Sequence, residues 1–432
     1  MANRNNLNLG LTLLIRYVRL MNSSLMIHKR YTQGIENLPG DCNRYLIICN
    51  HQNTANDPLN IIFALPFHYS IAVMARANVF SLHPLFTKLI NALGLVPAFR
   101  SDFDGSDTVE KNNESFDIIA ERVNDEHPFL VFPEGGHTQG HYLDPFTTGF
   151  VRIAFHCAAK ANWQEDIKIV PTAHHYEDYF TVNSDFMWSI GEPLSLKPYY
   201  EEYQQHPYKV LRRIKNMMHE KVRSLMLDMG KEDYAIKDFL RSSALNTERS
   251  SKMSLPERLK ADQTFAEALR TNSNYATIIE KATMLKAEEE KLGLLDLTIA
   301  KAPSIFKALP NILLLLLLLP LFIVSLWPNG ICYRLPIALL RTDVMFTNTY
   351  RFLVSALVLY PLAFFITLGV MWGCFGMPWL ALIWILLWFP LGLFANFYYN
   401  RCKATMQILR YNFCKNKLTD INALREELKK LL

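Results

Sequence analysis

The sequence has no pair of cysteines at the spacing of a metal or redox site. Its seven cysteines are scattered along 432 residues. An odd, scattered set indicates free thiols in a reducing compartment rather than a disulfide framework. The chain also lacks the basic, base-stacking motifs of nucleic-acid-binding proteins, so we expect no nucleic-acid partner.

Acidic residues are scarce in the last third of the chain. Residues 301–432 carry 13 Lys and Arg against 4 Asp and Glu, whereas residues 1–300 carry 32 against 36. The basic residues flank apolar runs, where anionic lipid head groups attract them. This asymmetry predicts a mildly acidic soluble domain followed by a basic membrane module, with membrane lipids as partners.

Three long apolar segments define that membrane module. The runs at 352–374 and 378–399 are each long enough to span a bilayer and are joined by a tight turn. We predict a transmembrane hairpin over 352–399, and a re-entrant hairpin over 309–340, which Pro320 and Pro328 interrupt. The alternative is three full spans.

The distribution of positive charge favours the re-entrant arrangement. It places the basic tail, 401–432, and the loop that carries Arg334, Arg341 and Arg351 on the same side as the first domain. By the positive-inside rule that side is the cytoplasm. The sequence therefore predicts a multi-pass membrane protein whose first domain faces the cytoplasm.

The remaining segments complete the domain organisation. Residues 1–30 contain a short apolar stretch with Arg16 and Arg19, which we interpret as an interfacial amphipathic helix; a core helix is the alternative. Residues 31–200 alternate strand and helix patterns, which is typical of an α/β domain with a largely parallel sheet flanked by helices. Residues 201–308 are rich in helix formers and charges and predict a helical spacer of two or three helices.

The chemistry-bearing motifs follow two apolar runs that predict buried strands. Asn50-His51 begins a polar stretch that ends at Asp57-Pro58, and Phe132-Pro133-Glu134-Gly135-Gly136 follows about 75 residues later. A histidine oriented by a nearby carboxylate acts as a general base near neutral pH. Such a pair suits deprotonation of an alcohol.

Four blocks in this order resemble the glycerolipid acyltransferases, such as 1-acylglycerol-3-phosphate and glycerol-phosphate acyltransferases. The blocks are His51 to Asp57, Gly94 to Arg100, Phe132 to Gly135, and Ile169 to Pro171. The resemblance covers roughly residues 30–200. Four blocks in the family's order are specific, whereas one alone would be weak.

Two positions depart from the family pattern. The commonest form has four residues between the histidine and the aspartate, whereas five separate His51 from Asp57 here, and Asn56 stands at the usual aspartate position. Either Asp57 or Asn56 then orients the ring; we favour Asp57, because an amide stabilises imidazolium less well than a carboxylate. His137 replaces an arginine after the Glu-Gly pair, which weakens the assignment of the substrate more than that of the reaction.

The resemblance implies roles for the site residues. His51 would take the proton of the acceptor hydroxyl while the hydroxyl oxygen attacks an acyl thioester. Glu134 would position the acceptor, and Arg100 would bind the phosphate of the acceptor. The backbone of Gly135 and Gly136 approaches the substrate or the developing oxyanion. Arg76 and Arg152 are weaker candidates for binding phosphate. We expect no metal, although His137 and His141 stand four residues apart and His174 and His175 are adjacent.

The sequence thus predicts a membrane-bound O-acyltransferase without a tightly held cofactor. The acyl donor is a thioester of coenzyme A or acyl carrier protein, and the acceptor is of the glycerophosphate type. Two alternatives are an acyltransferase for a different lysolipid or lipid hydroxyl, and a non-catalytic membrane scaffold built on a degenerate acyltransferase fold.

Overall fold

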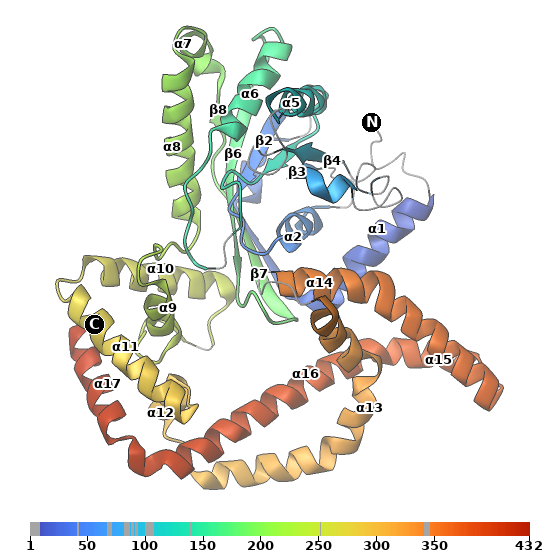
Figure 1. The fold of residues 1–432 in the computed structure, drawn as a ribbon, viewed down its shortest axis with the longest axis vertical. Coiled ribbons are helices and arrows are strands. Elements are labelled where there is room, and N and C mark those ends of the chain that lie inside the picture. Colours follow the sequence, from blue (N-terminus) through green and yellow to red (C-terminus); the bar gives the residue numbers. More distant parts are fainter. Residues whose placement is uncertain are drawn as a thin grey trace. The chain divides into compact units, whose positions relative to one another are not determined.

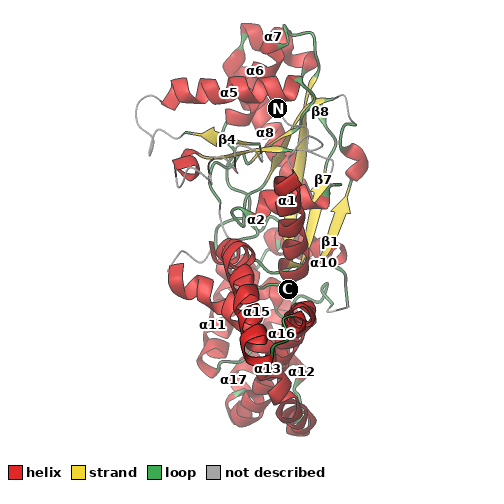
Figure 2. Cartoon of the chain, turned by 90° about the vertical axis from the view of Figure 1, so that its right-hand side faces the viewer, coloured by secondary structure: helices red, strands yellow, loops and turns green. Residues whose placement is uncertain are grey.

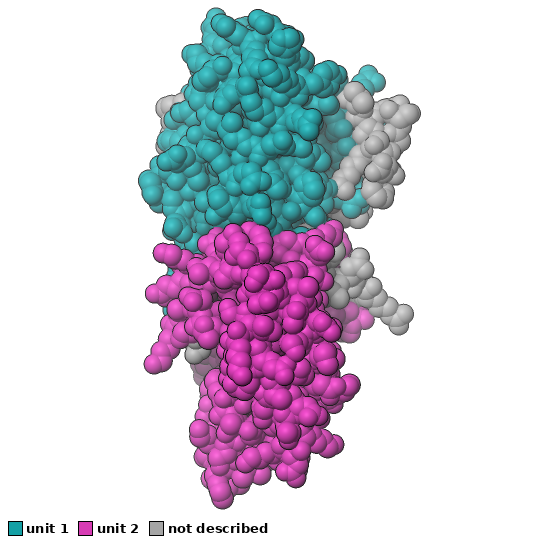
Figure 3. All heavy atoms as spheres, turned by 90° about the vertical axis from the view of Figure 1, so that its left-hand side faces the viewer, with its two compact units in different colours: residues 1–23, 27–228 teal, residues 24–26, 229–432 magenta. Residues whose placement is uncertain are grey.

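The computed structural model describes residues 9–40, 43–66, 71–81, 87, 90, 94–99, 108–137, 140–250, 252–340 and 346–432. The chain divides into two compact units (Figure 3). Unit 1 comprises residues 1–23 and 27–228, and unit 2 comprises residues 24–26 and 229–432. Among the described residues, the strands belong to unit 1, whereas unit 2 is helical. Figure 2 draws the strands in yellow and the helices in red.

Unit 1 is built on one mixed, mostly parallel sheet (Figure 1). The strands follow the order β1-β7-β6-β2-β5-β3-β4, and β8 pairs with β6. Among the strands of the described residues, the pairings of β6 with β7 and β8 are antiparallel and the others are parallel. The strands are β1 (Ile27–Gln33), β2 (Arg44–Cys49), β3 (Ala72–Arg76), β4 (Leu95–Ala98), β5 (Phe129–Val131), β6 (Ile167–Tyr176), β7 (Ser184–Ile190) and β8 (Leu194–Ser195).

The helices of unit 1 cover the sheet because alternate strand residues are apolar on both faces. Leu46 and Ile48 of β2 share one buried cluster with residues of α5, α6 and α8, while Ile47 between them is equally buried. The helices of unit 1 are α1 (Leu9–Met21), α2 (Asn56–Ala64), α5 (Thr108–Asn124), α6 (Gly149–Lys160), α7 (Tyr200–Gln205) and α8 (Pro207–Leu225). The predicted α/β class with a largely parallel sheet is confirmed.

The region after residue 200 differs from the predicted spacer. The described residues from 200 to 307 contain six α-helices, α7 to α12, rather than two or three. Of these, α8 packs into the core of unit 1. Apolar residues of α8 recur at helical spacing, as in Val210, Ile214 and Met218, all fully buried. The helix therefore completes the α/β domain.

Unit 2 begins with helices that form their own core. Apolar residues from α9, α10, α11 and α12 pack with residues of α17 and the end of α16, among them Leu240, Leu285 and Leu428. The helices of unit 2 are α9 (Tyr234–Ser242), α10 (Leu255–Thr271), α11 (Tyr275–Leu292), α12 (Asp296–Lys301), α13 (Ala308–Leu340), α14 (Thr347–Val354), α15 (Tyr360–Phe375), α16 (Trp379–Cys414) and α17 (Thr419–Leu431).

Three helical segments in the described part of the chain are long and apolar enough to cross a membrane: Ile305–Leu339, Thr347–Phe375 and Trp379–Lys417. The first is interrupted at Trp327, whose backbone is not helical, just before Pro328, one of the two prolines at which an interruption is predicted. Gly376 ends α15 in the left-handed conformation, so the tight turn before α16 is present. The re-entrant path of 309–340 remains a prediction.

Polar side chains join these apolar helices at the interruption. The Asn329 amide donates to the Trp388 carbonyl (3.0 Å) and accepts from the Tyr360 hydroxyl (2.9 Å). The Trp327 indole donates to Thr367 (3.2 Å). Such bonds are expected where backbone opened by proline must find partners from neighbouring helices.

Candidate active site

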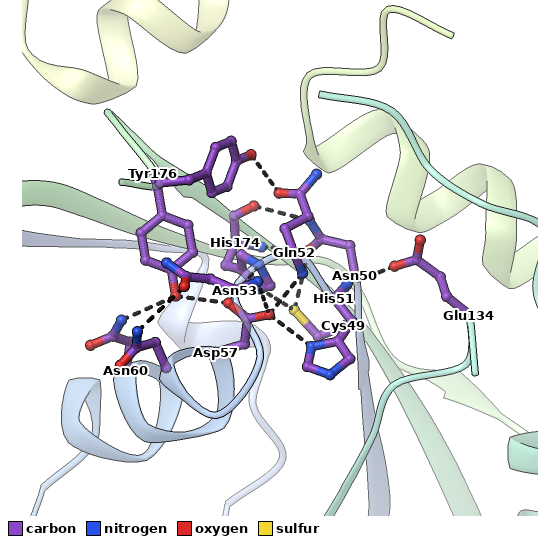
Figure 4. Close-up of polar contacts among 12 residues, drawn as sticks. Cys49, Asn50, His51, Gln52, Asn53, Asp57, Asn60, Glu134, His174 and Tyr176 are labelled. Carbon is purple, nitrogen blue, oxygen red and sulfur yellow. Dashed lines mark hydrogen bonds and ion pairs between the residues drawn. The ribbon is translucent and has the colours of Figure 1, made fainter. Parts of the chain in front are cut away.

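The two polar motifs meet because the strands before them are neighbours. β2 pairs in parallel with β5, with Ile48 opposite Val131, so both chains leave the sheet at the same edge. His51 follows β2 and Glu134 follows β5 (Figure 4). The site therefore lies outside the carboxyl ends of parallel strands, as predicted for an open α/β sheet.

The two predicted catalytic side chains are in direct contact. His51 Nδ1 lies 2.7 Å from Asp57 Oδ2, and Asp57 is fully buried. The His51 ring stacks on Phe132 with centroids 4.2 Å apart, and its side chain is 19% exposed. The bond at Nδ1 leaves Nε2 as the ring nitrogen available to a substrate.

The turn between these residues accommodates the extra residue. Thr54 has φ +47°, a left-handed conformation that a threonine seldom adopts. Asp57 then falls in the first turn of α2, where the helix dipole favours a negative charge. Asn56 is also buried, but its amide donates to Asn53 Oδ1 (3.3 Å). The geometry thus brings Asp57, and not Asn56, to His51.

Asp57 accepts several further hydrogen bonds. Oδ2 accepts from the backbone N–H groups of Gln52 and Asn53, both at 2.8 Å, and Oδ1 accepts from the Tyr176 hydroxyl at 2.8 Å. Burial by itself would raise the pKa of Asp57, but the neighbouring His174 and His51 and the Asn53 N–H together lower it to about 2. The carboxylate is therefore ionised at neutral pH.

Glu134 clamps two loops together through its two oxygens. Oε1 accepts from the His51 backbone N–H (2.6 Å) and Oε2 from that of Asp144 (3.0 Å). Burial raises the pKa of Glu134 to about 8, and the two N–H groups offset only part of that rise. In this structure the side chain fixes the backbone of the histidine.

The glycines that follow Glu134 form the turn of the second motif. Gly135 has φ +70°, which favours glycine, and its N–H donates to the Phe132 carbonyl (3.3 Å). A Cβ added at Gly136 would meet no heavy atom within 4 Å, so the backbone there borders open space. Arg100 lies outside the described residues.

The structure adds residues that the sequence analysis did not assign to the site. The Asn50 amide pairs with the backbone of His174, and the Tyr176 hydroxyl reaches Asp57. Gln52 bonds to Tyr179 (2.7 Å), whose hydroxyl lies 3.2 Å from His141 Nδ1. Asn50 and Gln52 lie within the first motif, so proximity to His51 was the available signal; Tyr176 comes from a distant strand and gave none.

The loop histidines do not gather into a metal centre. His137 lies edge-on to His51 with ring centroids 5.3 Å apart, and His141 lies near His175 at 5.1 Å. Within the residues that the structure describes, no group of three or more His, Cys, Asp or Glu side chains is arranged to hold a metal ion.

Comparison with known proteins gives the class of this domain. Residues 29–175 match the acyltransferase family, so the chain contains an acyltransferase domain, and the predicted family resemblance is confirmed over that range. Among solved structures, the chain is similar to the 1-acyl-sn-glycerophosphate (LPA) acyltransferase PlsC from Thermotoga maritima, with 17% identity and a TM-score of 0.32. That similarity covers 48% of this chain and 79% of the other. No curated protein matches the chain.

Proposed function

We propose that this protein is a membrane-bound O-acyltransferase of phospholipid synthesis. It moves a fatty acyl group from a thioester to a hydroxyl of a glycerophosphate-type acceptor. The observation that carries the proposal is the contact between His51 and the buried Asp57 inside an acyltransferase domain. That pair is suited to taking a proton from an alcohol at neutral pH.

The proposed reaction needs no covalent acyl-enzyme. His51 Nε2 takes the proton of the acceptor hydroxyl while its oxygen attacks the thioester carbonyl carbon. Asp57 stabilises the imidazolium that forms, as its short contact with Nδ1 allows. The carbon–sulfur bond then breaks, and the imidazolium returns its proton to the leaving thiolate. The backbone N–H of Gly136 is our candidate for stabilising the oxyanion.

An acyl-transfer assay tests the proposal and separates its alternatives. Purified protein would be given labelled acyl-coenzyme A or acyl carrier protein with glycerol phosphate, dihydroxyacetone phosphate or lysophosphatidate, and lysolipids that lack glycerol phosphate. We expect transfer to one of the first three acceptors. Transfer only to the other lysolipids would contradict the acceptor class, and no transfer to any acceptor would favour the scaffold.

Arg100 is proposed to bind the phosphate of the acceptor. We expect Arg100→Ala to raise the KM for the acceptor by about tenfold or more, and to change that for the donor little, because loss of a phosphate contact weakens ground-state binding of one substrate. Arg100→Lys should recover part of the loss, since a point charge cannot replace a planar fork. Equal changes in both KM values would contradict the role.

We further propose that the acyltransferase domain and the basic tail both face the cytoplasm, with 309–340 re-entrant. The support is the excess of basic residues after Asn400, 8 against 3 acidic. Single cysteines at Ser106, Asn329 and Lys417, in a cysteine-free background, would be probed with an impermeant thiol reagent in sealed vesicles. We expect Ser106→Cys and Lys417→Cys to react from the same face and Asn329→Cys from neither. Labelling of Lys417→Cys from the opposite face would establish three spans.

A further inference from the structure

Asp57 lies between two imidazole rings, and only one of them belongs to the proposed catalytic pair. Oδ2 faces His51 Nδ1 at 2.7 Å, and Oδ1 faces His174 Nε2 at 3.2 Å (Figure 4). The side chains of Asp57 and His174 are both fully buried. Among the described residues, His174 Nε2 has no hydrogen-bond partner of regular geometry, and its contact with this carboxylate is a charge-to-ring contact at 3.2 Å.

The fold holds His174 in this place through its backbone. β6 continues beyond the end of β2, where Cys49 is opposite Thr172, and His174 lies two residues further on. There the Asn50 side chain replaces β2 as the hydrogen-bonding partner of β6. Its Oδ1 accepts from the His174 N–H (2.8 Å), and its Nδ2 donates to the His174 carbonyl (3.2 Å). The ring is therefore fixed over Asp57 by the residue that precedes His51.

The groups around His174 favour one tautomer of its ring. Burial raises the pKa of the Cys49 thiol well above its usual range, so the group is an S–H donor. It lies 3.3 Å from His174 Nδ1 and 3.4 Å from Asn50 Oδ1, which already accepts from the His174 N–H. An S–H that donates to Nδ1 leaves the proton of the neutral ring on Nε2, facing Asp57. The other tautomer would direct a lone pair at the carboxylate.

The neutral state of His174 follows from its surroundings. Burial lowers the pKa of His174 to about 4, although the adjacent Asp57 acts in the opposite direction. The titratable groups that act on it or contact it are Asp57 on α2, Cys49 on β2, His51 in the loop after β2, and Tyr176 on its own strand. From β7, the ring of Phe186 stacks on it at 6.3 Å. His174 is thus a neutral dipole beside a buried anion.

We propose that His174 is a positioning residue that shares Asp57 with His51 and limits the carboxylate's pull on the catalytic ring. The proposal rests on the function proposed above. A neutral ring whose Nε2 lies 3.2 Å from Oδ1 places a dipole beside the negative charge, so Asp57 stabilises the His51 imidazolium less than an unshared carboxylate would. Removal of the His174 ring nitrogen should therefore strengthen the coupling between Asp57 and His51.

The test follows the His51 ring itself and needs no substrate. Full-length protein in detergent micelles, labelled with [15N]histidine, would be titrated by NMR, and the His51 signal assigned by its loss in His51→Gln. We expect the titration midpoint in His174→Phe, which keeps a flat ring but no N–H, to rise by about one pH unit. His174→Gln, whose amide N–H reaches toward Oδ1, should restore much of the wild-type midpoint.

A matched control replaces a histidine that pairs with a carboxylate elsewhere. His156 Nε2 on α6 lies 2.6 Å from Asp117 Oδ1 on α5. We therefore expect His156→Phe to leave the titration midpoint of His51 unchanged. An unchanged midpoint in His174→Phe would overturn the proposal. If that variant does not fold, the wild-type spectrum decides: a proton on Nε2 of His174 supports the proposal and a proton on Nδ1 overturns it.

The acid limb of the activity profile gives a second readout. In His174→Phe, the pH at which half of kcat/KM is lost should rise with the NMR midpoint, whereas a merely structural role would lower activity equally at every pH. Failure of the proposed acyl transfer would leave the NMR result standing, so the two failures are distinguishable.

Discussion

His51→Ala is expected to lower acyl transfer by about a hundredfold to ten-thousandfold, because the general base is lost. The ring is held for that task by the bond to Asp57 and by stacking on Phe132. Alanine supplies no group that reaches the acceptor hydroxyl. The measurement is the initial rate of transfer with saturating acyl thioester, compared with wild type at the same protein concentration.

The fold should survive this substitution. The bond from residue 51 to Glu134 comes from the backbone N–H, which alanine retains. We therefore expect expression and the melting temperature to stay near wild type. His137→Ala is the matched control, since that ring lies 5.3 Å from His51 and is given no part in proton transfer. Residual activity of His51→Ala above about a tenth of wild type would remove His51 from the mechanism.

The second large effect is expected at Asp57. Asp57→Asn keeps the shape of the side chain but replaces the charge that stabilises imidazolium, and its amide can present an N–H group to the ring or to Gln52 and Asn53. We expect kcat to fall by about a hundredfold or more, as when the orienting carboxylate of a catalytic histidine is lost. KM for both substrates should change little, because Asp57 is fully buried behind His51.

Asn56→Ala is the comparison variant, because Asn56 stands at the usual position of the aspartate in the sequence. The Asn56 amide contacts Asn53 and not the ring, so its loss should lower kcat less than tenfold. Both variants would be assayed beside wild type, with circular dichroism to check folding. A greater loss in Asn56→Ala than in Asp57→Asn would show that the amide orients His51 and that the observed contact is not used.

Much of unit 1 could be predicted because its signals are local. The apolar runs before the two motifs form β2 and β5, and the first motif leads directly into α2. Pairing of β2 with β5 then places both motifs at one edge of the sheet. The one-residue excess between His51 and Asp57 could not be resolved from sequence, because it depends on the left-handed backbone of Thr54.

Elements whose partners are distant in sequence were missed. β1 has the sequence IHKRYTQ, mostly exposed or half-buried, and becomes a strand by pairing with β7 about 155 residues later. The α8 helix was assigned to the spacer because its polar face resembles the helices that follow. Only the sheet against which it packs distinguishes it.

The same reason explains why His174 was not assigned to the site. In the sequence it lies beside His175 and suggested only a loop histidine. Its relation to Asp57 depends on the length of β6 and on the Asn50 side chain, which acts across more than 120 residues. Local patterns identify the catalytic pair, whereas the groups that tune it come from tertiary structure.

The carboxyl groups of Asp57 and Glu134 provide an internal measure of how often the site opens. Asp57 and Glu134 together bind the backbone N–H groups of four residues: His51, Gln52, Asn53 and Asp144. Because these amide protons are bonded to carboxylates and not to a strand or helix ladder, they exchange with deuterium only when the motif loops separate from those side chains. Their exchange rates therefore measure how often the loops around the proton-transfer site open in the protein without substrate.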